Sequence, residues 1–342
     1  MRNSNNSKNT ICLYAPVSNL DLFRTVGFYR DDLCALQLLS KDVVATNSLR
    51  TLFANRPNLT VGYFYGKSLF AAIITKIIGG RVVMTGGADQ IAPNLVRGYR
   101  LYLHRLFAFL CVIFSNKILL SCKDDIKNFK KLCFGITYLE NKIKYSPHVV
   151  RPSPLPRIKK NYESEVFKAF TLCWMGSIGN VQRKGVDKAI LLISILKNFG
   201  IRASLNIAGT KGPGLKYLED LVDSLSLQDS VVFLGRISED EKHRWLSSDA
   251  VYVQLSSHEG FGVAAAEAFF SGMVVVHSNK GGLADVIGEN GVIVDIEKLE
   301  NVNKFDIELF IKSYLKFKPR DDIIQSNLHL YSVENRAKSF QE

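Results

Sequence analysis

The amino-acid sequence predicts an α/β protein with two doubly wound domains, each built on a parallel sheet. Short β-branched runs alternate with helical segments along all 342 residues, which is the pattern of consecutive βαβ units. A proline-rich stretch over residues 146–156 interrupts this alternation, because proline fits neither a helix interior nor a central strand. We therefore expect one domain over residues 1–150 and a second over residues 151–326, facing each other across a cleft at the carboxyl ends of their strands.

In the first domain, strands are expected where apolar, β-branched runs are bounded by turn residues. These runs cover residues 10–15, 42–46, 59–64, 81–85 and 117–121. Helical periodicity is found between them, over residues 31–39, 68–78, 95–114 and 124–131. The stretch 101–114 is apolar on nearly every side. It is therefore either a helix buried against the sheet or a membrane-contacting surface.

The second domain follows the same pattern. Its strands are expected over residues 170–175, 203–208, 231–234, 250–255, 273–277 and 292–294. Its helices are expected over residues 185–199, 215–225, 239–246 and 262–271. The C-terminal segment 331–340 is also helical in pattern.

The net charge of +12 belongs entirely to the first domain. Residues 1–150 hold 20 Lys and Arg against 8 Asp and Glu, whereas the remaining residues hold 24 of each. A basic half suits nucleic acid, anionic lipid or a phosphorylated substrate. No aromatic-rich or zinc-finger pattern supports nucleic acid, so a membrane surface or a lipid-diphosphate acceptor fits better. A merely soluble basic surface is the alternative.

Composition also restricts the compartment and the cofactors. The polar N-terminus lacks the apolar core of a secretory leader, and the longest apolar run, residues 106–114, is too short to span a bilayer. The six cysteines form no CxxC pair and lie in apolar runs, as expected for reduced core residues. We expect a cytoplasmic protein that can lie peripherally on the inner face of the cytoplasmic membrane. No set of His, Cys and carboxylate residues has metal-ligand spacing, so no metal site is expected.

The most informative segment is 256–272, which places Glu259 and Glu267 eight residues apart. Gly260 and Gly262 allow the backbone to turn tightly and to approach a ligand. The helix expected from Gly262 has unpaired N–H groups and a dipole that favour a phosphate or diphosphate. Carboxylates suit sugar hydroxyls flanking that diphosphate, so the segment fits a sugar nucleotide. An ordinary core helix that happens to carry two glutamates is the alternative.

Four further glycine loops follow expected strands of the second domain. They cover residues 174–185, 206–214, 231–237 and 281–283. The first of them brings two cations, Arg183 and Lys184, to the start of a helix. A single glycine loop is weak support, because turns use glycine for backbone reasons alone. Several in this order, together with Lys184 and the two glutamates, are hard to produce by chance.

These residues carry a resemblance to a known family. Residues from about 170 to 295 resemble the donor-binding domain of the retaining family 4 glycosyltransferases, the glycosyl transferases group 1, which have GT-B architecture with two Rossmann-like domains. The matching elements are Lys184-Gly185, Ala208-Gly209, residues 231–235, residues 249–253, residues 257–262, Glu267-Ala268, Gly272 and residues 281–283. The Glu259/Glu267 spacing corresponds to the E-x7-E motif of that family. Residues 81–89 and 119–125 match its acceptor-side domain more loosely.

The resemblance assigns catalytic and donor-binding roles to residues of this chain. Lys184 would neutralise the donor diphosphate as the anomeric C–O bond breaks. Glu259 would hold hydroxyls of the transferred sugar and favour the positive charge of an oxocarbenium-like state. Glu267 would accept hydrogen bonds from the ribose hydroxyls. Further donor contacts would come from Gly27, Gly176, Ser177, Gly209, Gly235, Gly260, Phe261 and Gly262.

Two departures from the family pattern affect the catalytic set. The family usually has Arg directly after the glycine of the first loop, but Ser177 follows Gly176 here. Arg183 could supply the second cation instead. The family also often has a His after the strand that corresponds to residues 81–85, and this chain has none there. Asp89 is then the polar candidate for the acceptor hydroxyl or the donor sugar, with a helix N-cap or turn as the alternative.

The sequence therefore predicts a metal-independent, hexosyltransferase-type glycosyltransferase. It would move a sugar, with retention, from a nucleotide-diphosphate sugar to a hydroxyl of a saccharide or glycolipid acceptor, in cell-envelope polysaccharide or glycolipid synthesis. The donor is a co-substrate, and no cofactor is expected. Expected partners are a glycolipid or lipid-linked saccharide and an anionic membrane surface, but not nucleic acid. In this architecture a C-terminal helix, about 327–342, would cross back to the first domain. The alternatives are a non-catalytic glycosyltransferase-like subunit that binds a nucleotide sugar or partner protein, and a peripheral membrane or nucleic-acid-binding protein.

Overall fold

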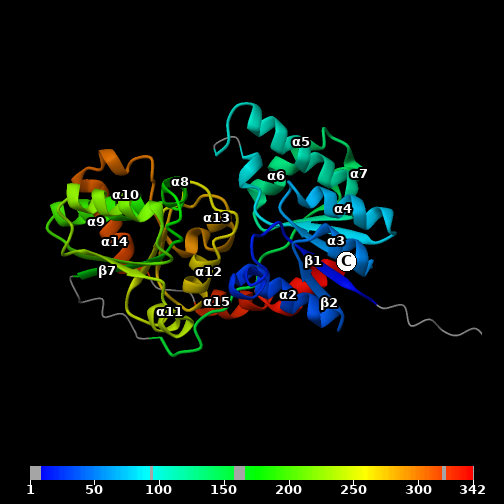
Figure 1. Ribbon diagram of the computed structural model, residues 1–342. Helices are drawn as coiled ribbons and strands as arrows, with labels where there is room; N and C mark the ends of the chain where they lie inside the picture. The colour runs from blue at the N-terminus through cyan, green and yellow to red at the C-terminus, as the bar shows by residue number, and fades with distance from the viewer. Residues whose placement is uncertain (1–8, 93–94, 158–165, 318–320, 342) are drawn as a thin grey trace, which may run out of the picture. The chain divides into compact units, whose positions relative to one another are not determined.

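The computed structural model describes residues 9–92, 95–157, 166–317 and 321–341 (Figure 1). The contacts within the chain divide it into two compact units. Unit 1 comprises Met1–Val149 and His329–Glu342, and unit 2 comprises Val150–Leu328. Each unit holds a six-stranded sheet in which the paired strands are parallel, so the predicted α/β class is confirmed.

Unit 1 has the strand order β2-β1-β3-β4-β5-β6. Its strands are β1 (Ile11–Tyr14), β2 (Val43–Thr46), β3 (Leu59–Tyr63), β4 (Arg81–Thr85), β5 (Lys117–Leu120) and β6 (Ile143–Tyr145). Its helices are α1 (Leu22–Thr25), α2 (Gly27–Leu39), α3 (Leu49–Asn55), α4 (Ser68–Ile77), α5 (Tyr99–Phe114), α6 (Lys123–Leu132), α7 (Thr137–Glu140) and α16 (Val333–Gln341). The chain adds strands on both sides of β1, which is the doubly wound arrangement.

Both faces of the unit 1 sheet are buried, because successive side chains of a strand point to opposite faces. In β4, Val82 and Met84 pack in the core with residues of α4, α5 and α6. Val83, between them, packs on the other face with residues of α2 and α16. Leu119 of β5 faces the same side as Val83. The two helical layers follow directly from this alternation.

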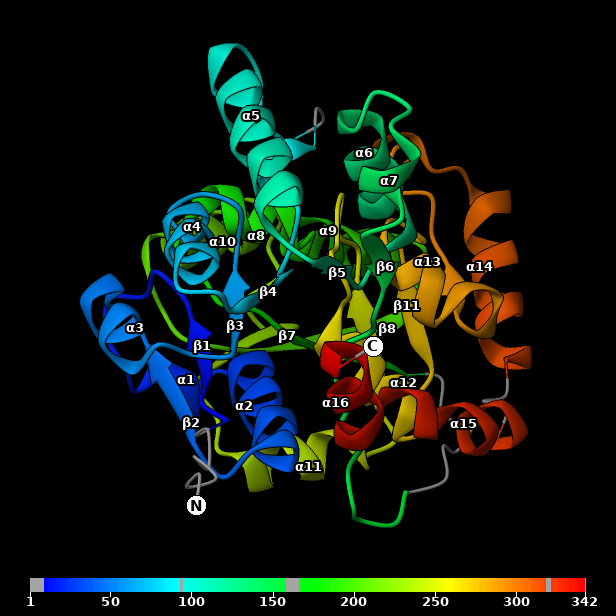
Figure 2. The same cartoon turned by 90° about the vertical axis from the view of Figure 1, so that its right-hand side faces the viewer.

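A buried ion pair fixes α16 to unit 1, where it packs against α2 (Figures 1 and 2). Arg336 Nε lies 2.7 Å from Asp32 Oδ1, and Nη2 lies 2.8 Å from Oδ2. Arg336 also donates to the hydroxyls of Thr85 and Ser146, and the Tyr63 hydroxyl donates to Asp32 at 2.5 Å. Every donor and acceptor in this group comes from unit 1, which places the C-terminal helix in that unit.

Helix α5 packs against the sheet, as one of the two expectations stated, but only through one stripe of its surface. Ala108, Cys111 and Val112 are buried in the core, whereas Tyr102 and Leu106 are exposed. A helix that covers a sheet buries only the stripe that faces it, so the opposite stripe of this apolar helix faces solvent. Among the described residues, no helix has the length and apolarity needed to cross a membrane.

Unit 2 has the strand order β12-β11-β10-β7-β8-β9. Its strands are β7 (Val166–Leu172), β8 (Arg202–Ala208), β9 (Val231–Gly235), β10 (Val251–Gln254), β11 (Val275–His277) and β12 (Val292–Ile293). Its helices are α8 (Ile178–Arg183), α9 (Val186–Asn198), α10 (Pro213–Ser224), α11 (Glu239–Leu246), α12 (Val263–Phe270), α13 (Gly282–Val286), α14 (Lys304–Lys316) and α15 (Asp321–Asn327). The chain reverses its direction of growth between β7 and β10, and ligands of such sheets bind at the carboxyl ends of strands at that point.

Several elements differ from the sequence-based expectation. Strand β7 pairs with β8 from Val166 to Leu172, so it begins four residues and ends three residues before the expected strand at 170–175. The small-residue loop before Lys184 contains the short helix α8, which the Ser177 side chain caps. Helices α3, α14 and α15 and strand β6 were not expected. The short 3-10 helices are η1 (Asp89–Ile91), η2 (Gly288–Asn290), η3 (Leu299–Asn301) and η4 (Leu328–Tyr331).

Candidate functional site

The loops that follow β7 and β10 meet at the point where the strand order of unit 2 reverses. Gly185, between α8 and α9, has φ of 66° and lies against the end of β10. A Cβ on Gly185 would sit 1.9 Å from the backbone oxygen of Leu255, so no other residue allows this approach. The contact brings Lys184 beside the segment that carries Glu259.

Lys184 and Glu259 form an ion pair at this place. Lys184 Nζ lies 2.9 Å from Glu259 Oε1 and 2.6 Å from Oε2. Gln254 Nε2 donates to Oε2 at 2.6 Å, and the Ser256 hydroxyl donates to the same oxygen at 3.3 Å. The Glu259 side chain is 8% exposed and that of Lys184 26%. Three donors therefore fix the orientation of a buried carboxylate, while its counter-ion stays within reach of a ligand.

The backbone around Glu259 is held from two sides. Arg183 donates from Nη1 to the backbone oxygen of His258 at 3.3 Å. The Gly282 N–H donates to the backbone oxygen of Glu259 at 2.7 Å. Gly281, with φ of 57°, approaches so closely that a Cβ would lie 2.3 Å from that oxygen. The glycine pair at the start of α13, Gly281 as N-cap and Gly282 as first residue, therefore supports the turn of Glu259, which is a structural reason for two glycines there.

Helix α12 begins directly after this turn. Gly262 is its N-cap residue with φ of 84°, a left-handed conformation that favours glycine. Phe261 is buried, and Gly260 precedes it in the turn. Glu259 thus lies before the helix and Glu267 in its second turn, as the sequence indicated. A Cβ built on Gly262 would lie 3.2 Å from Glu259 Cγ, so the start of the helix and the Glu259 side chain are close together, which suits a ligand with both phosphate and hydroxyl groups.

Glu267 has an ion-pair partner that sequence analysis missed. Lys242 of α11 places its Nζ 3.2 Å from Glu267 Oε2 and 2.8 Å from Glu239 Oε2. Burial acts to lower the pKa of Lys242, but the carboxylates of Glu267 and Glu239 outweigh it and raise the pKa. The Lys242 side chain is 13% exposed and that of Glu267 9%. The contact joins two different helices, and the sequence offers only the helical spacing of Glu239 and Lys242.

The other donor-side candidates also lie at carboxyl ends of unit 2 strands. Ser177, which stands where the family usually has Arg, accepts a hydrogen bond from the Asn180 N–H as the N-cap of α8. Gly176 precedes it. Gly209 follows β8 and approaches the Cys173 backbone so closely that a Cβ would lie 1.7 Å from its oxygen. Its N–H donates at 2.8 Å to the backbone oxygen of Gly235, the last residue of β9. Three consecutive strand ends are therefore tied together.

Two predicted residues lie in unit 1 rather than unit 2. Gly27 is the first residue of α2, which begins four residues before the expected start at Asp31. Asp89 is the first residue of η1 and follows Gly86 and Gly87, which come directly after β4. Both therefore occupy helix starts after loops of the first sheet. Within the described residues, no group of three or more His, Cys, Asp or Glu side chains could hold a metal ion.

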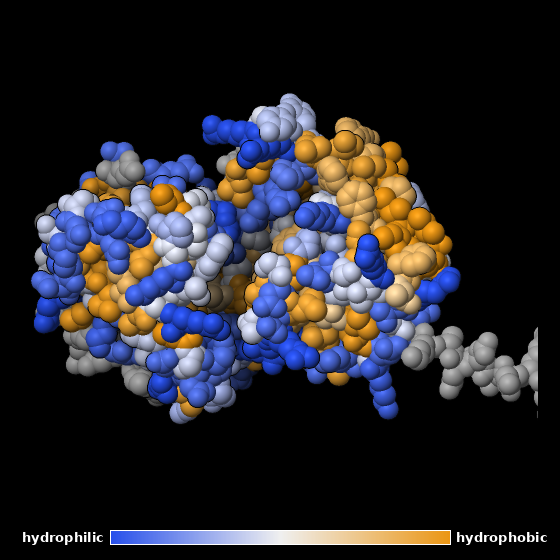
Figure 3. Space-filling view, in the orientation of Figure 1, coloured by the Kyte–Doolittle hydropathy of each residue, from blue (hydrophilic) through white to orange (hydrophobic). Residues whose placement is uncertain are grey.

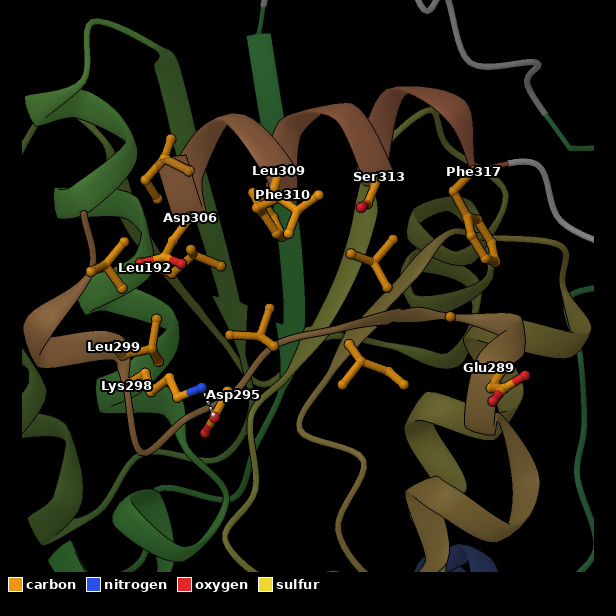
Figure 4. A pocket seen from close by; sticks show the side chains of 16 residues that line it. Leu192, Glu289, Asp295, Lys298, Leu299, Asp306, Leu309, Phe310, Ser313 and Phe317 are labelled. Carbon is orange, nitrogen blue, oxygen red and sulfur yellow. Dashed lines mark ion pairs between the residues drawn. The ribbon is translucent and has the colours of Figure 1, made fainter. Parts of the chain in front are cut away.

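A pocket of about 450 Å³ lies away from this cluster (Figure 4). It opens between α14 and the edge strand β12, and Figure 4 shows Leu309 and Phe310 of α14 directed toward it. Asp295 and Lys298 form an ion pair of 3.4 Å at its side. None of its lining residues belongs to the Lys184–Glu259 group, and its apolar lining does not suit a diphosphate.

The comparisons with known proteins point to one family. Residues 170–326 match the family model of the glycosyl transferases group 1. The uncharacterized glycosyltransferase MJ1607 of Methanocaldococcus jannaschii is 42% identical over 142 residues, which cover 40% of this chain and 35% of that protein. The phosphatidylinositol N-acetylglucosaminyltransferase gpi3 subunit of Schizosaccharomyces pombe is 26% identical over 193 residues, which cover 54% of this chain and 41% of that protein. The chain thus spans less than half the length of these curated relatives.

A solved structure resembles nearly the whole chain. The crystal structure of Anabaena Alr3699/HepE in complex with UDP and glucose matches with a TM-score of 0.70 and 14% identity, over 96% of this chain and 98% of that chain. At this identity the likeness shows the fold alone. Together with the two six-stranded parallel sheets, it confirms the predicted GT-B architecture.

Proposed function

Because residues 170–326 of this chain form a glycosyl transferases group 1 domain, we propose that the protein transfers a sugar from a nucleotide-diphosphate sugar to an acceptor hydroxyl. The observation that carries the proposal is the Lys184–Glu259 ion pair at the carboxyl ends of β7 and β10. It supplies a cation for a diphosphate and a carboxylate for sugar hydroxyls within one buried group.

The pair fits the charges that develop during glycosyl transfer. As the anomeric C–O bond breaks, negative charge grows on the diphosphate and positive charge grows on the sugar ring. A donor diphosphate would draw Lys184 Nζ away from Glu259, and the freed carboxylate would accept hydrogen bonds from sugar hydroxyls. Gln254 and Ser256 keep the carboxylate oriented during this exchange. Charges placed in advance where transition-state charge develops are usually the largest catalytic contribution.

The positive groups of the site bear on the finer features of the reaction. Because Lys184, Arg183 and the N-terminus of α12 supply positive potential, we propose a transfer that needs neither a metal ion nor a cofactor. We propose hexosyl transfer with retention because the sequence resembles the retaining family 4 glycosyltransferases. The relative named for a phosphatidylinositol substrate and the structure bound to UDP and glucose support a nucleotide-sugar donor and a glycolipid or saccharide acceptor. We assign the reaction to cell-envelope polysaccharide or glycolipid synthesis. We propose that the site residues have the roles given above, with Asp89 contacting the acceptor hydroxyl or the donor sugar.

Donor hydrolysis tests the proposal without knowledge of the acceptor. The full chain would be incubated with UDP-, GDP- and ADP-sugars, and nucleotide release would be measured beside thermal stabilisation by each compound. Glu259→Gln is expected to lower hydrolysis at least 100-fold, because it removes a charge that acts in the transition state. Lys168→Gln, which removes the surface pair with Asp249, is the matched control. The proposal is refuted if no nucleotide sugar is hydrolysed and none stabilises the protein. The anomer of the released sugar tests retention.

One observation favours the non-catalytic alternative. Ser177 replaces the usual arginine, and its hydroxyl caps α8 instead of facing a ligand. A chain that binds a nucleotide sugar but does not turn it over would show thermal stabilisation without hydrolysis. The same two measurements therefore separate the two functions.

A further inference from the structure

Helix α5 of unit 1 presents a continuous apolar stripe to solvent. At about 100° per residue, one arc of about 100° on the helix collects Tyr99, Tyr102, Leu103, Leu106, Leu110 and Ile113. Tyr99 is 75% exposed, Tyr102 73% and Leu106 52%. Ala108 and Val112, on the opposite side of the helix, are buried in the core. Figure 2 shows α5 projecting beyond α4 and the sheet of its unit. Leu110 packs partly against the core, whereas Tyr99, Tyr102, Leu103 and Leu106 leave the N-terminal part of the stripe open to solvent.

The loop between α6 and α7 extends this apolar surface. Phe134 is 81% exposed, and its ring centroid lies 5.9 Å from that of Phe109 on α5. Tyr138 of α7 is 72% exposed. Figure 3 shows a broad apolar area over α4, α5 and α7. A contiguous apolar area of this kind marks an interaction surface more often than scattered single residues do.

Basic residues surround the apolar stripe. Arg100 and Arg105 lie on either side of it, and α5 contains no acidic residue. Exposed Lys130 and Lys131 end the neighbouring helix α6. Lys142 donates to the backbone oxygens of the last turn of α5, at 3.0 and 3.1 Å. Tyrosines and aliphatic side chains inside a rim of Lys and Arg match the interface of an anionic lipid bilayer.

We infer that this surface, the α5 patch, docks unit 1 on an anionic membrane. The patch consists of Tyr99, Tyr102, Leu103, Leu106, Ile113, Phe134 and Tyr138 with the rim Arg100, Arg105, Lys130 and Lys131. This inference rests on the proposed function, to which it adds a membrane as partner. Docking itself requires neither the donor nor the acceptor, so it can be measured without them. A second copy of the chain suits the patch poorly, because like charges would face each other across a symmetric contact.

Sedimentation with vesicles tests the inference. The full chain would be mixed with vesicles of equal parts phosphatidylglycerol and phosphatidylcholine, and with phosphatidylcholine alone. Binding is expected only to the anionic vesicles and should weaken as salt is raised. The triple variant Arg100→Gln/Lys130→Gln/Lys131→Gln is expected to lower the partition coefficient on the order of 100-fold, because each cation contributes about fivefold. The variant Tyr102→Ser/Leu103→Ser/Leu106→Ser is expected to lower the partition coefficient by about tenfold or more, because three apolar side chains no longer bury their area in the bilayer.

Matched variants separate docking from other effects. Val232→Ser/Leu309→Ser/Leu315→Ser removes three exposed apolar residues of unit 2 and should leave vesicle binding unchanged. Donor hydrolysis without lipid should be equal in the parent and the α5 variants. Vesicle binding and donor hydrolysis are therefore independent readouts, and failure of the proposed function can be told apart from failure of docking. The inference is overturned if the folded parent ignores anionic vesicles, if the control variant loses as much binding, or if light scattering shows a dimer that the α5 variant abolishes.

Discussion

Replacing Arg336 by methionine is expected to destabilise unit 1 by about 3–5 kcal/mol. Arg336 and Asp32 share hydrogen bonds of 2.7 and 2.8 Å, and each side chain is 1% exposed. Burial acts to raise the pKa of Asp32, but the Arg336 guanidinium outweighs it and holds the pKa below its usual value. Without Arg336, the carboxylate keeps its hydrogen bond from Tyr63 but loses its counter-charge. Removing one partner of a buried pair costs about 3–5 kcal/mol.

The two tryptophans allow this effect to be assigned to one unit. Trp174 and Trp245 both belong to unit 2, so tryptophan fluorescence follows unit 2 while far-UV circular dichroism follows both units. With a urea dependence of about 1–3 kcal/mol per molar, Arg336→Met should lower the unfolding midpoint of unit 1 by about 2 M. The fluorescence transition should stay in place. Lys338→Met, at an exposed position on the same helix, is the control. A shift no larger than that of the control would refute the reasoning.

Three other perturbations test the site and its support. Lys242→Met should raise the donor KM about tenfold with little change in kcat, because Glu267 loses the cation that orients it. Lys242→Arg should restore binding, and an equal fall in kcat would contradict a positioning role. Gly281→Ala should lower the Tm and the donor-induced thermal shift, since its Cβ would lie 2.3 Å from the Glu259 backbone oxygen; an unchanged melting curve would contradict that contact. Burial lowers the pKa of His277 from 6.5 to about 4. Because the unfolded chain binds the proton more readily, the folded protein loses stability as the pH falls from 6.5 to about 4, by about 3 kcal/mol in all, and keeps it fully above pH 6.5. His277→Gln should reduce this pH dependence of the free energy of unfolding, measured in urea.

The regular alternation of β-branched runs and helical segments predicted the sheets well. Each expected strand is present, because apolar, β-branched runs are visible in the sequence both for strands buried on both faces, such as β1 and β10, and for the half-exposed strand β9. Glu259 and Glu267 also lie before and within α12 as expected, since Gly260 and Gly262 mark the turn between them. Local signals were enough for these features.

Local sequence signals did not predict contacts between segments that are far apart in the chain. Lys242 reads as an ordinary charge on an amphipathic helix, and only the packing of α11 beside α12 brings it to Glu267. Helix α5 has apolar residues on both stripes, so periodicity could not tell that one stripe faces solvent. The short helix α8 was missed because a run of small residues around Ser177 is equally typical of a loop.

The pairing of Asp32 with Arg336 also sets an order of events during synthesis. The two residues are 304 positions apart, so the Asp32 carboxylate exists long before its partner leaves the ribosome. At about 5–20 residues per second, the delay is on the order of 15–60 s. During that interval, the face of the first sheet that Phe340 and Ala337 cover lacks these side chains, and the entire unit 2 is translated before they are added. The unit that is made first is therefore the one that is completed last.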